Sequence, residues 1–248
     1  MATSTKKDSS KKVVQNPKMK DKLEIRARED LTEKQQELLN ILTNKQTKIV
    51  FLVGPAGTSK TYCAILAGLM LLNEKKVSEI IYLRSAVESS ENKLGFLPGE
   101  TDDKMLPYVQ PLLDKLTELL PKADIDKLNK ENRVLGMPIN YLRGINWNSK
   151  FIIGDEFQNC SRKELVTIMT RLGEFSKLVM CADPDQVDIG NKSGYMSMVN
   201  LFDDVESQEQ GIYVFRFNDK DVVRSGLCKY LLYKFKEFLL KGTFAINK

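Results

Sequence analysis

The chain has 248 residues, enough to bury the core of one α/β domain, with or without an inserted segment. It contains no histidine, which excludes His-based catalytic triads, His metal ligands and imidazole general bases. No apolar run approaches the roughly 18 residues of a membrane span, and the polar N-terminus lacks the apolar segment of a signal peptide. We therefore expect a cytoplasmic protein with no membrane partner.

The four cysteines are widely spaced and are expected to be buried thiols that form neither a disulfide framework nor a zinc site: Cys63, Cys160, Cys181 and Cys228.

Positive charge is concentrated at the N-terminus. Residues 1–22 carry seven lysines and two aspartates, a net charge of +5, which equals the net charge of the whole chain. A lysine-rich segment without aromatic residues buries too little apolar surface to fold alone, so we expect a disordered arm. Two functions remain open for this arm, namely contact with nucleic-acid phosphates and simple solubilisation. Residues 23–248, which are electrically balanced, form the expected folded domain.

The first predicted helix begins near Leu31. Thr32 and Gln35 have the spacing of a capping box, in which each side chain bonds the backbone N–H of the other residue. A second interpretation is that Gln35 or Gln36 recognises the adenine of a nucleotide, because both residues shortly precede a predicted phosphate-binding loop. The two interpretations are compatible, and the sequence leaves both open.

The segment that follows this helix has the pattern of a phosphate-binding loop. The apolar run Ile49–Val53 predicts a buried parallel strand, and an apolar helix is predicted over Tyr62–Leu72. Small residues and a Lys-Thr pair lie between them, so backbone N–H groups and a helix N-terminus would face an anion. In this pattern the lysine reaches the β- and γ-phosphates and the threonine binds Mg²⁺. The predicted ATP-binding residues of this phosphate loop are Gly54, Pro55, Ala56, Gly57, Thr58, Ser59, Lys60 and Thr61.

One residue of the phosphate loop departs from G-x-x-x-x-G-K-[ST], because Ser59 stands where the pattern has glycine. Glycine adopts a positive φ at this position without a Cβ penalty. A serine held in the same conformation costs about 1–2 kcal/mol. We therefore expect Ser59→Gly to tighten ATP binding or to raise stability. The competing interpretation is that the Ser59 hydroxyl bonds a phosphate oxygen and belongs to the site.

A second strand is predicted at Ile80–Leu83. The proline-containing stretch beyond it, about residues 92–135, is predicted to form a helical insertion on top of the sheet. After the insertion come Tyr141, Arg143 and Trp147. These side chains either stack on single-stranded bases or pack against the domain, and packing is the more common fate of such aromatics.

Acidic residues follow the third predicted strand, Phe151–Gly154. A carboxylate pair at the end of a buried strand is costly unless it serves a cation or a reacting group. We expect Asp155 to bind Mg²⁺ and Glu156 to orient and deprotonate the attacking water.

The fourth predicted strand, Leu178–Cys181, is followed by Gln186, a neutral side chain suited to sensing the γ-phosphate of ATP. A fifth strand, Gly211–Phe217, precedes a long helix that we expect from about Asp219. Arg224 would lie in the first turn of this helix, where positive charge is unfavourable without an anionic partner.

Eight segments, by their order and approximate spacing, resemble the PhoH-like (phosphate-starvation-inducible) P-loop ATPases. The similarity extends from about Leu31 to about Tyr233. The segments are GPAGTSKT, RSAVES, KLGFLPGE, DKMLPYVQPLLD, PINYLRG, FIIGDEFQN, TRLGEFSKLVMCADPDQVD and DVVRSGL. GFLPG and YLRG are far more particular to this family than the two nucleotide motifs, which many ATPases share.

The resemblance implies a single RecA-like P-loop core related to superfamily 1 helicases, in which helices flank a five-stranded parallel sheet of order 5-1-4-3-2. It implies ATP and Mg²⁺ as cofactors, RNA or single-stranded DNA as a partner, and a homo-oligomer such as a hexameric ring. Thr61 and Asp155 would bind the metal. The resemblance gives catalytic roles to Lys60, Glu156, Gln186 and Arg224. The departures from the family pattern are Ser59, Ser85, Gly154 and Ala182.

The sequence therefore predicts an Mg²⁺-dependent ATPase of the PhoH-like type that acts on or with RNA or single-stranded DNA. The alternative from another class is a nucleotide-gated binding or assembly module that does not hydrolyse ATP. Glu156 and Gln186 argue against this alternative, because binding alone requires neither side chain. A small-molecule kinase is a third interpretation, and a glutamate placed to activate water disfavours it.

Overall fold

The computed structural model describes residues 22–85, 101–139 and 146–245. Several predictions concern segments outside these ranges. They include the lysine-rich arm except for Lys22, the first residues of the predicted insertion, and the side chains of Tyr141 and Arg143.

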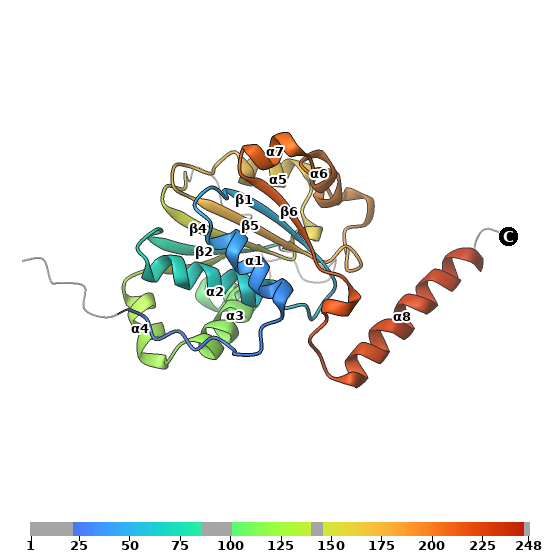
Figure 1. Ribbon diagram of the computed structural model, residues 1–248, viewed down its shortest axis with the longest axis horizontal. Helices are drawn as coiled ribbons and strands as arrows, with labels where there is room; N and C mark the ends of the chain where they lie inside the picture. The colour runs from blue at the N-terminus through green and yellow to red at the C-terminus, as the bar shows by residue number, and fades with distance from the viewer. Residues whose placement is uncertain (1–21, 86–100, 140–145, 246–248) are drawn as a thin grey trace, which may run out of the picture.

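The described residues form one sheet of six parallel strands (Figure 1). Its strand order is β3-β2-β4-β5-β1-β6. The strands are β1 (Ile49–Val53), β2 (Glu79–Arg84), β3 (Val134–Pro138), β4 (Lys150–Asp155), β5 (Lys177–Ala182) and β6 (Ile212–Arg216). Read from β6, the first five strands follow the predicted order 5-1-4-3-2, so the predicted RecA-like arrangement of the sheet is confirmed.

The predicted number of strands is wrong, because β3 adds a sixth strand at the edge of the sheet beside β2. Its sequence, VLGMP, contains Gly136 and Pro138, and both residue types are unusual inside strands. An edge position tolerates them. A methyl group on Gly136 would collide with Val109, so the missing side chain lets helix α3 pack closely on this strand.

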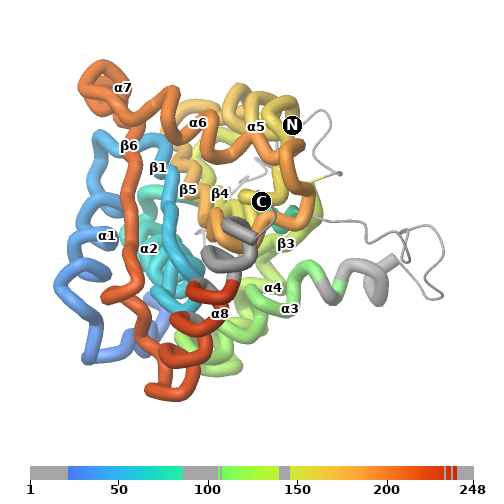
Figure 2. Tube along the Cα trace, turned by 90° about the vertical axis from the view of Figure 1, so that its right-hand side faces the viewer, coloured from blue at the N-terminus to red at the C-terminus, as the bar shows by residue number. Residues whose placement is uncertain are grey.

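Helices cover both faces of the sheet, as Figures 1 and 2 show from two directions. On one face lie α1 (Glu33–Thr43), α2 (Lys60–Asn73), α3 (Thr101–Leu119) and α4 (Lys122–Lys130). On the other face lie α5 (Arg162–Met169), α6 (Tyr195–Leu201) and α7 (Val205–Glu209). Each face has its own apolar core. Large members of the first core are Leu38, Ile65, Leu69 and Phe151, and those of the second are Phe51, Phe157, Ile168 and Tyr195.

The capping box predicted at the first helix is present, between Thr32 and Gln35 of α1. Ser161 and Glu164 form a second capping box at the start of α5. The predicted insertion is helical through α3 and α4, and it ends in the edge strand β3. None of the helices in the described ranges is long and apolar enough to span a membrane.

Three of the four cysteines are buried, as predicted, whereas the prediction is wrong for Cys228, which is half-buried. Burial raises the pKa of the Cys63 and Cys160 thiols to about 12. These thiols therefore stay protonated at neutral pH and behave as small apolar side chains.

The C-terminal helix begins later than predicted. Asp219–Asp221 forms a 3₁₀ turn with a capping box between Asn218 and Asp221, after which the backbone is extended at Val222. Helix α8 starts only at Gly226 and runs to Ala245. Arg224 therefore lies in the segment ahead of α8 and not in the first turn of a helix. In Figure 1, α8 projects away from the rest of the domain.

Candidate nucleotide-binding site

The phosphate loop connects the end of β1 to the start of α2 at the carboxyl edge of the sheet, the edge at which parallel α/β sheets bind ligands. A cavity of about 370 Å³ opens beside it. Gly57 has φ 87° and Ser59 has φ 66°, so the positive φ predicted for Ser59 is confirmed. The cavity is lined by the phosphate loop and by residues that follow β4 and β5.

Lys60 lies in the first turn of α2 and points back along the phosphate loop. Its Nζ donates to the carbonyl oxygens of Gly54 at 2.6 Å and Pro55 at 2.9 Å. Burial lowers the pKa of Lys60, and the nearby carboxylates of Asp183, Asp155 and Glu156 oppose this shift. An anion in the cavity would favour the charged form of this ammonium group. The position of Lys60 thus suits a phosphate ligand.

Thr61 and Asp155 are in direct contact, although 94 positions separate them in the sequence. The Thr61 hydroxyl donates to Asp155 Oδ1 at 2.9 Å, and the Tyr82 hydroxyl donates to Asp155 Oδ2 at 2.5 Å. A hydroxyl and a carboxylate are hard oxygen donors of the kind that Mg²⁺ prefers. The two predicted metal ligands therefore lie together and fit the ion that the family resemblance implies.

Glu156 follows Asp155 in a left-handed conformation, with φ 57° and ψ 33°. Such a conformation is costly for a residue with a side chain, and it is found disproportionately at functional sites. Glu156 Oε2 accepts a 2.5 Å hydrogen bond from Gln158 Nε2. The same nitrogen lies 3.2 Å from the carbonyl oxygen of Gln186, and Gln158 Oε1 accepts from the backbone N–H of Asp183. Gln158 thus ties the predicted base to the segment that carries Gln186.

Gln186 is exposed and lines the cavity on the side of β5. Its backbone N–H donates to the carbonyl oxygen of Asp183 at 3.0 Å, which closes a turn after the strand. A side chain in this place faces the same cavity as Lys60 and Glu156. The predicted sensor and the predicted base are therefore brought to one site.

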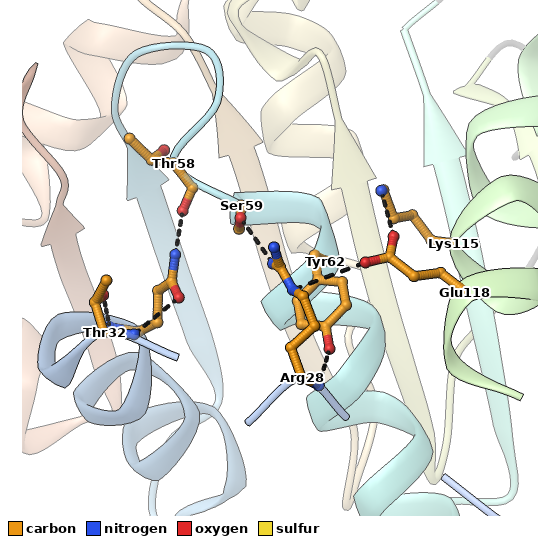
Figure 3. Close-up of polar contacts among 8 residues, drawn as sticks. Arg28, Thr32, Thr58, Ser59, Tyr62, Lys115 and Glu118 are labelled. Carbon is orange, nitrogen blue, oxygen red and sulfur yellow. Dashed lines mark hydrogen bonds and ion pairs between the residues drawn. The ribbon is translucent and has the colours of Figure 1, made fainter. Parts of the chain in front are cut away.

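Gln35 is almost completely buried, with 1% of its surface exposed. Its Oε1 accepts from the Thr32 backbone N–H, and its Nε2 donates to the carbonyl oxygen of Thr58 at 3.3 Å (Figure 3). Gln35 therefore contacts the phosphate loop itself. Gln36 is exposed and donates to the carbonyl oxygen of Leu31. Recognition of adenine by either residue stays a prediction.

Arg224 lies against the phosphate loop of its own chain. A methyl group on Gly57 would come within 2.6 Å of Arg224 Nε, and the Val223 backbone N–H donates to the Gly57 carbonyl oxygen at 2.9 Å. Both Val223 and Arg224 line the cavity. The predicted arginine thus reaches the predicted site, although it comes from the segment ahead of α8.

The residues at this site that were not predicted from the sequence include Arg28 and Gln158, which line the cavity, and Tyr82, which bonds Asp155. Tyr82 gave a weak signal, since a tyrosine inside a buried strand needs a partner for its hydroxyl. Gln158 also gave a weak signal, because its polar amide lies two residues after the acidic pair and needs hydrogen-bond partners there. Arg28 gave no signal, because its partner Ser59 lies 31 positions away.

The similarity of the chain to a known family extends over most of its length. A family model described as PhoH-like protein matches residues 27–236. The chain belongs to the PhoH-like family. The family resemblance noted from the eight segments is therefore confirmed.

Related proteins carry the same description. The PhoH-like protein of Mycobacterium tuberculosis is 39% identical over 181 residues, which cover 72% of this chain and 50% of the relative. The PhoH-like protein of Bacillus subtilis is 35% identical over 185 residues, covering 74% and 56%. Protein PhoH2 of Bacillus subtilis is 34% identical over 154 residues, covering 60% and 35%. This PhoH-like chain spans about half the length of the first two relatives and a smaller share of the third.

Among solved structures, the SWI2/SNF2 ATPase core of Sulfolobus solfataricus in complex with dsDNA aligns with a TM-score of 0.48. The sequence identity is 14%, and the alignment covers 80% of this chain and 46% of that chain.

Two departures of this PhoH-like chain from the family pattern have local explanations. A methyl group on Gly154 would collide with the ring of Phe157, so glycine at the end of β4 makes room for this buried aromatic. The Ser85 hydroxyl donates to the Asn159 carbonyl oxygen at 2.8 Å, which ties the end of β2 to the turn after β4.

Trp147 is 1% exposed, so this aromatic packs against the domain and does not present a face to nucleic-acid bases.

Proposed function

We propose that this PhoH-like protein binds ATP with Mg²⁺ in the cavity beside the phosphate loop and hydrolyses it, acting on or with RNA or single-stranded DNA. The observation that supports this best is the 2.9 Å contact between Thr61 and Asp155, with Lys60 and Glu156 lining the same cavity. Nucleotide binding uses the loop and the lysine. Hydrolysis in addition requires a group that activates water, and Glu156 is next to the proposed metal ligand.

Each side chain has a specific task in this proposal. Lys60 exchanges its two carbonyl partners for the β- and γ-phosphates, and the backbone N–H groups of the loop bind the same oxygens. Thr61 and Asp155 hold Mg²⁺, which when bound offsets the negative charge of the phosphates. Glu156 orients the attacking water and accepts its proton. Gln186 contacts the γ-phosphate.

The nucleic-acid part of the proposal has a direct test, which is phosphate release from ATP measured with and without single-stranded RNA or DNA. We expect either nucleic acid to raise the rate. A rate that both leave unchanged would contradict a nucleic-acid-linked ATPase. ATP binding without phosphate release, in either condition, would instead support the non-hydrolysing module.

We also propose that copies of the chain assemble. Helix α8 projects from the domain and exposes several apolar side chains, namely Leu227, Tyr230, Tyr233, Phe235 and Phe238. Exposed apolar surface of this kind is unfavourable in water and is typical of an interaction surface. A second copy that covers α8 would give a homo-oligomer. Copies arranged head to tail close into a ring, such as a hexamer, when the rotation between neighbours divides a full turn evenly. Light scattering of the full chain measures the assembly directly, and a monomeric mass would contradict it.

The lysine-rich arm, residues 1–22, provides a further prediction. If its lysines bind phosphates of a single strand, deleting the arm flattens the salt dependence of nucleic-acid binding. The log–log slope should change by about 0.7 for each phosphate that the arm neutralises. Binding is measured across a range of salt concentrations for the full chain and for residues 23–248. An unchanged slope would leave the arm as a solubilising segment.

A further inference from the structure

The segment ahead of α1 is fixed along two helices and reaches the phosphate loop. In Figure 1 this N-terminal strap, residues 23–32, runs past α4 and α3 before α1 begins. The Arg26 backbone N–H donates to the Leu119 carbonyl oxygen at 2.8 Å, and the Arg28 backbone N–H donates to the Tyr62 hydroxyl at 2.9 Å. These bonds fix the backbone of Arg28 beside the first turn of α2.

The guanidinium group of Arg28 has three partners in this place (Figure 3). Nη2 donates to Ser59 Oγ at 3.0 Å, and the central carbon lies 4.1 Å from the centre of the Tyr62 ring. Nε lies 3.7 Å from Oε1 of Glu118, a residue of α3. The other carboxylate oxygen of Glu118 pairs with Lys115 at 2.7 Å. The Tyr62 ring and Glu118 thus orient the guanidinium toward the loop.

Ser59 is the residue at which this protein lacks the glycine of the phosphate-loop pattern. It holds φ 66° and ψ 28°, the left-handed conformation that glycine adopts freely and serine does not. A serine without support would leave this conformation for part of the time. In the relaxed conformations the peptide before Lys60 would turn, and its N–H would point away from a bound phosphate.

We propose that Arg28 is a positioning residue for the phosphate loop, an inference that rests on the ATP-binding function proposed above. Its hydrogen bond to the Ser59 hydroxyl holds Ser59 in the left-handed conformation and so replaces the conformational freedom of the missing glycine. This changes the expectation drawn from the sequence. Ser59→Gly removes the strain, but it also removes the partner of Arg28, so its own effect on ATP affinity is expected to stay within about threefold.

The effect of removing Arg28 follows from the population of the binding-competent loop. The apparent affinity is the intrinsic affinity multiplied by the fraction of molecules that hold the competent conformation. The left-handed conformation of serine is disfavoured about 5- to 30-fold. Arg28→Met keeps most of the apolar contact with the Tyr62 ring and loses the donor. We therefore expect ATP to bind Arg28→Met about 5- to 30-fold more weakly than the parent.

A double-mutant cycle separates positioning from direct contact with the nucleotide. ATP is titrated at fixed Mg²⁺ against the parent, Arg28→Met, Ser59→Gly and the double variant. If Arg28 acts through Ser59, the double variant binds ATP within about threefold of Ser59→Gly, because glycine needs no support. Equal reductions of affinity in the serine and glycine backgrounds would show that Arg28 touches the nucleotide or acts by another route, and no reduction in either would show that it does nothing for binding. Either result overturns the proposal.

Two further variants serve as controls for folding and chemistry. Arg26→Met changes an exposed arginine of the same strap, whose side chain pairs with Glu24, and should bind ATP like the parent. Arg28→Lys keeps a donor for the Ser59 hydroxyl and should recover most of the affinity that Arg28→Met loses. A lysine variant as weak as the methionine variant would contradict the hydrogen-bond account.

Amide hydrogen exchange of residues 54–61, measured without nucleotide, tests the proposal independently of ATP binding. Exchange should be faster in Arg28→Met than in the parent and return to the parent rate in the double variant. If the parent fails to bind ATP but this exchange pattern appears, the proposed function fails while the positioning role holds. If ATP binds and exchange is the same in all four proteins, the positioning role fails alone.

Discussion

Arg224→Ala is expected to hydrolyse ATP about a thousandfold more slowly than the parent while binding ATP nearly normally. A rate loss of this size is typical when an arginine that stabilises phosphoryl transfer is removed. Arg224 extends over Gly57 of its own phosphate loop and lines the cavity that contains Lys60 and Glu156. A guanidinium group there would meet negative charge that grows on the γ-phosphate during transfer. Hydrolysis at the parent rate would exclude this role.

Mixing two inactive variants tests whether Arg224 serves the site of its own chain or the site of a neighbouring copy. If Arg224 acts within its own chain, as its contact with Gly57 indicates, a mixture of Arg224→Ala and Glu156→Gln should stay inactive, because no site holds both groups. If Arg224 instead serves a neighbouring copy, mixed interfaces pair an intact arginine with an intact glutamate. Activity recovered in a mixture shown to co-assemble would therefore contradict the intramolecular assignment.

Glu156→Gln is expected to lower hydrolysis by about a hundredfold or more while ATP still binds. Glutamine keeps the shape of the side chain and removes the group that accepts the proton of the attacking water. The exposed Glu174, which lies in the turn between α5 and β5, provides a matched control, and Glu174→Gln should hydrolyse ATP like the parent. If Glu156→Gln hydrolyses ATP at the parent rate, the base is assigned to the wrong residue.

The core of the sheet was predictable because buried parallel strands are short, continuous apolar runs. β1, β4 and β5 follow this pattern, and the residues that follow such strands necessarily gather at one edge of the sheet. Thr61 and Asp155 could therefore be expected together. The edge strand β3 has a glycine and a proline in five residues, so the period and composition of its sequence do not indicate a strand.

The support of the phosphate loop was only half predictable. The positive φ of Ser59 follows from the steric requirement of the loop alone. Its partner Arg28 depends on where the N-terminal strap runs, and that path is fixed by bonds from Arg28 to Tyr62 and from Arg26 to Leu119. Contacts between segments so distant in the chain leave no periodic trace in the sequence.

The start of α8 was misplaced for a different reason. The capping box between Asn218 and Asp221 begins only a 3₁₀ turn, and the backbone becomes extended again at Val222 before α8 starts at Gly226.

Phosphate release by the parent and by Lys60→Ala, prepared identically, tests most directly whether ATP is hydrolysed in the cavity beside the phosphate loop. Lys60→Ala deletes the charge that faces the phosphates, so it should weaken ATP binding and reduce hydrolysis to background. We expect the parent to release phosphate only when Mg²⁺ is present. Equal rates from the two proteins would contradict hydrolysis at this site.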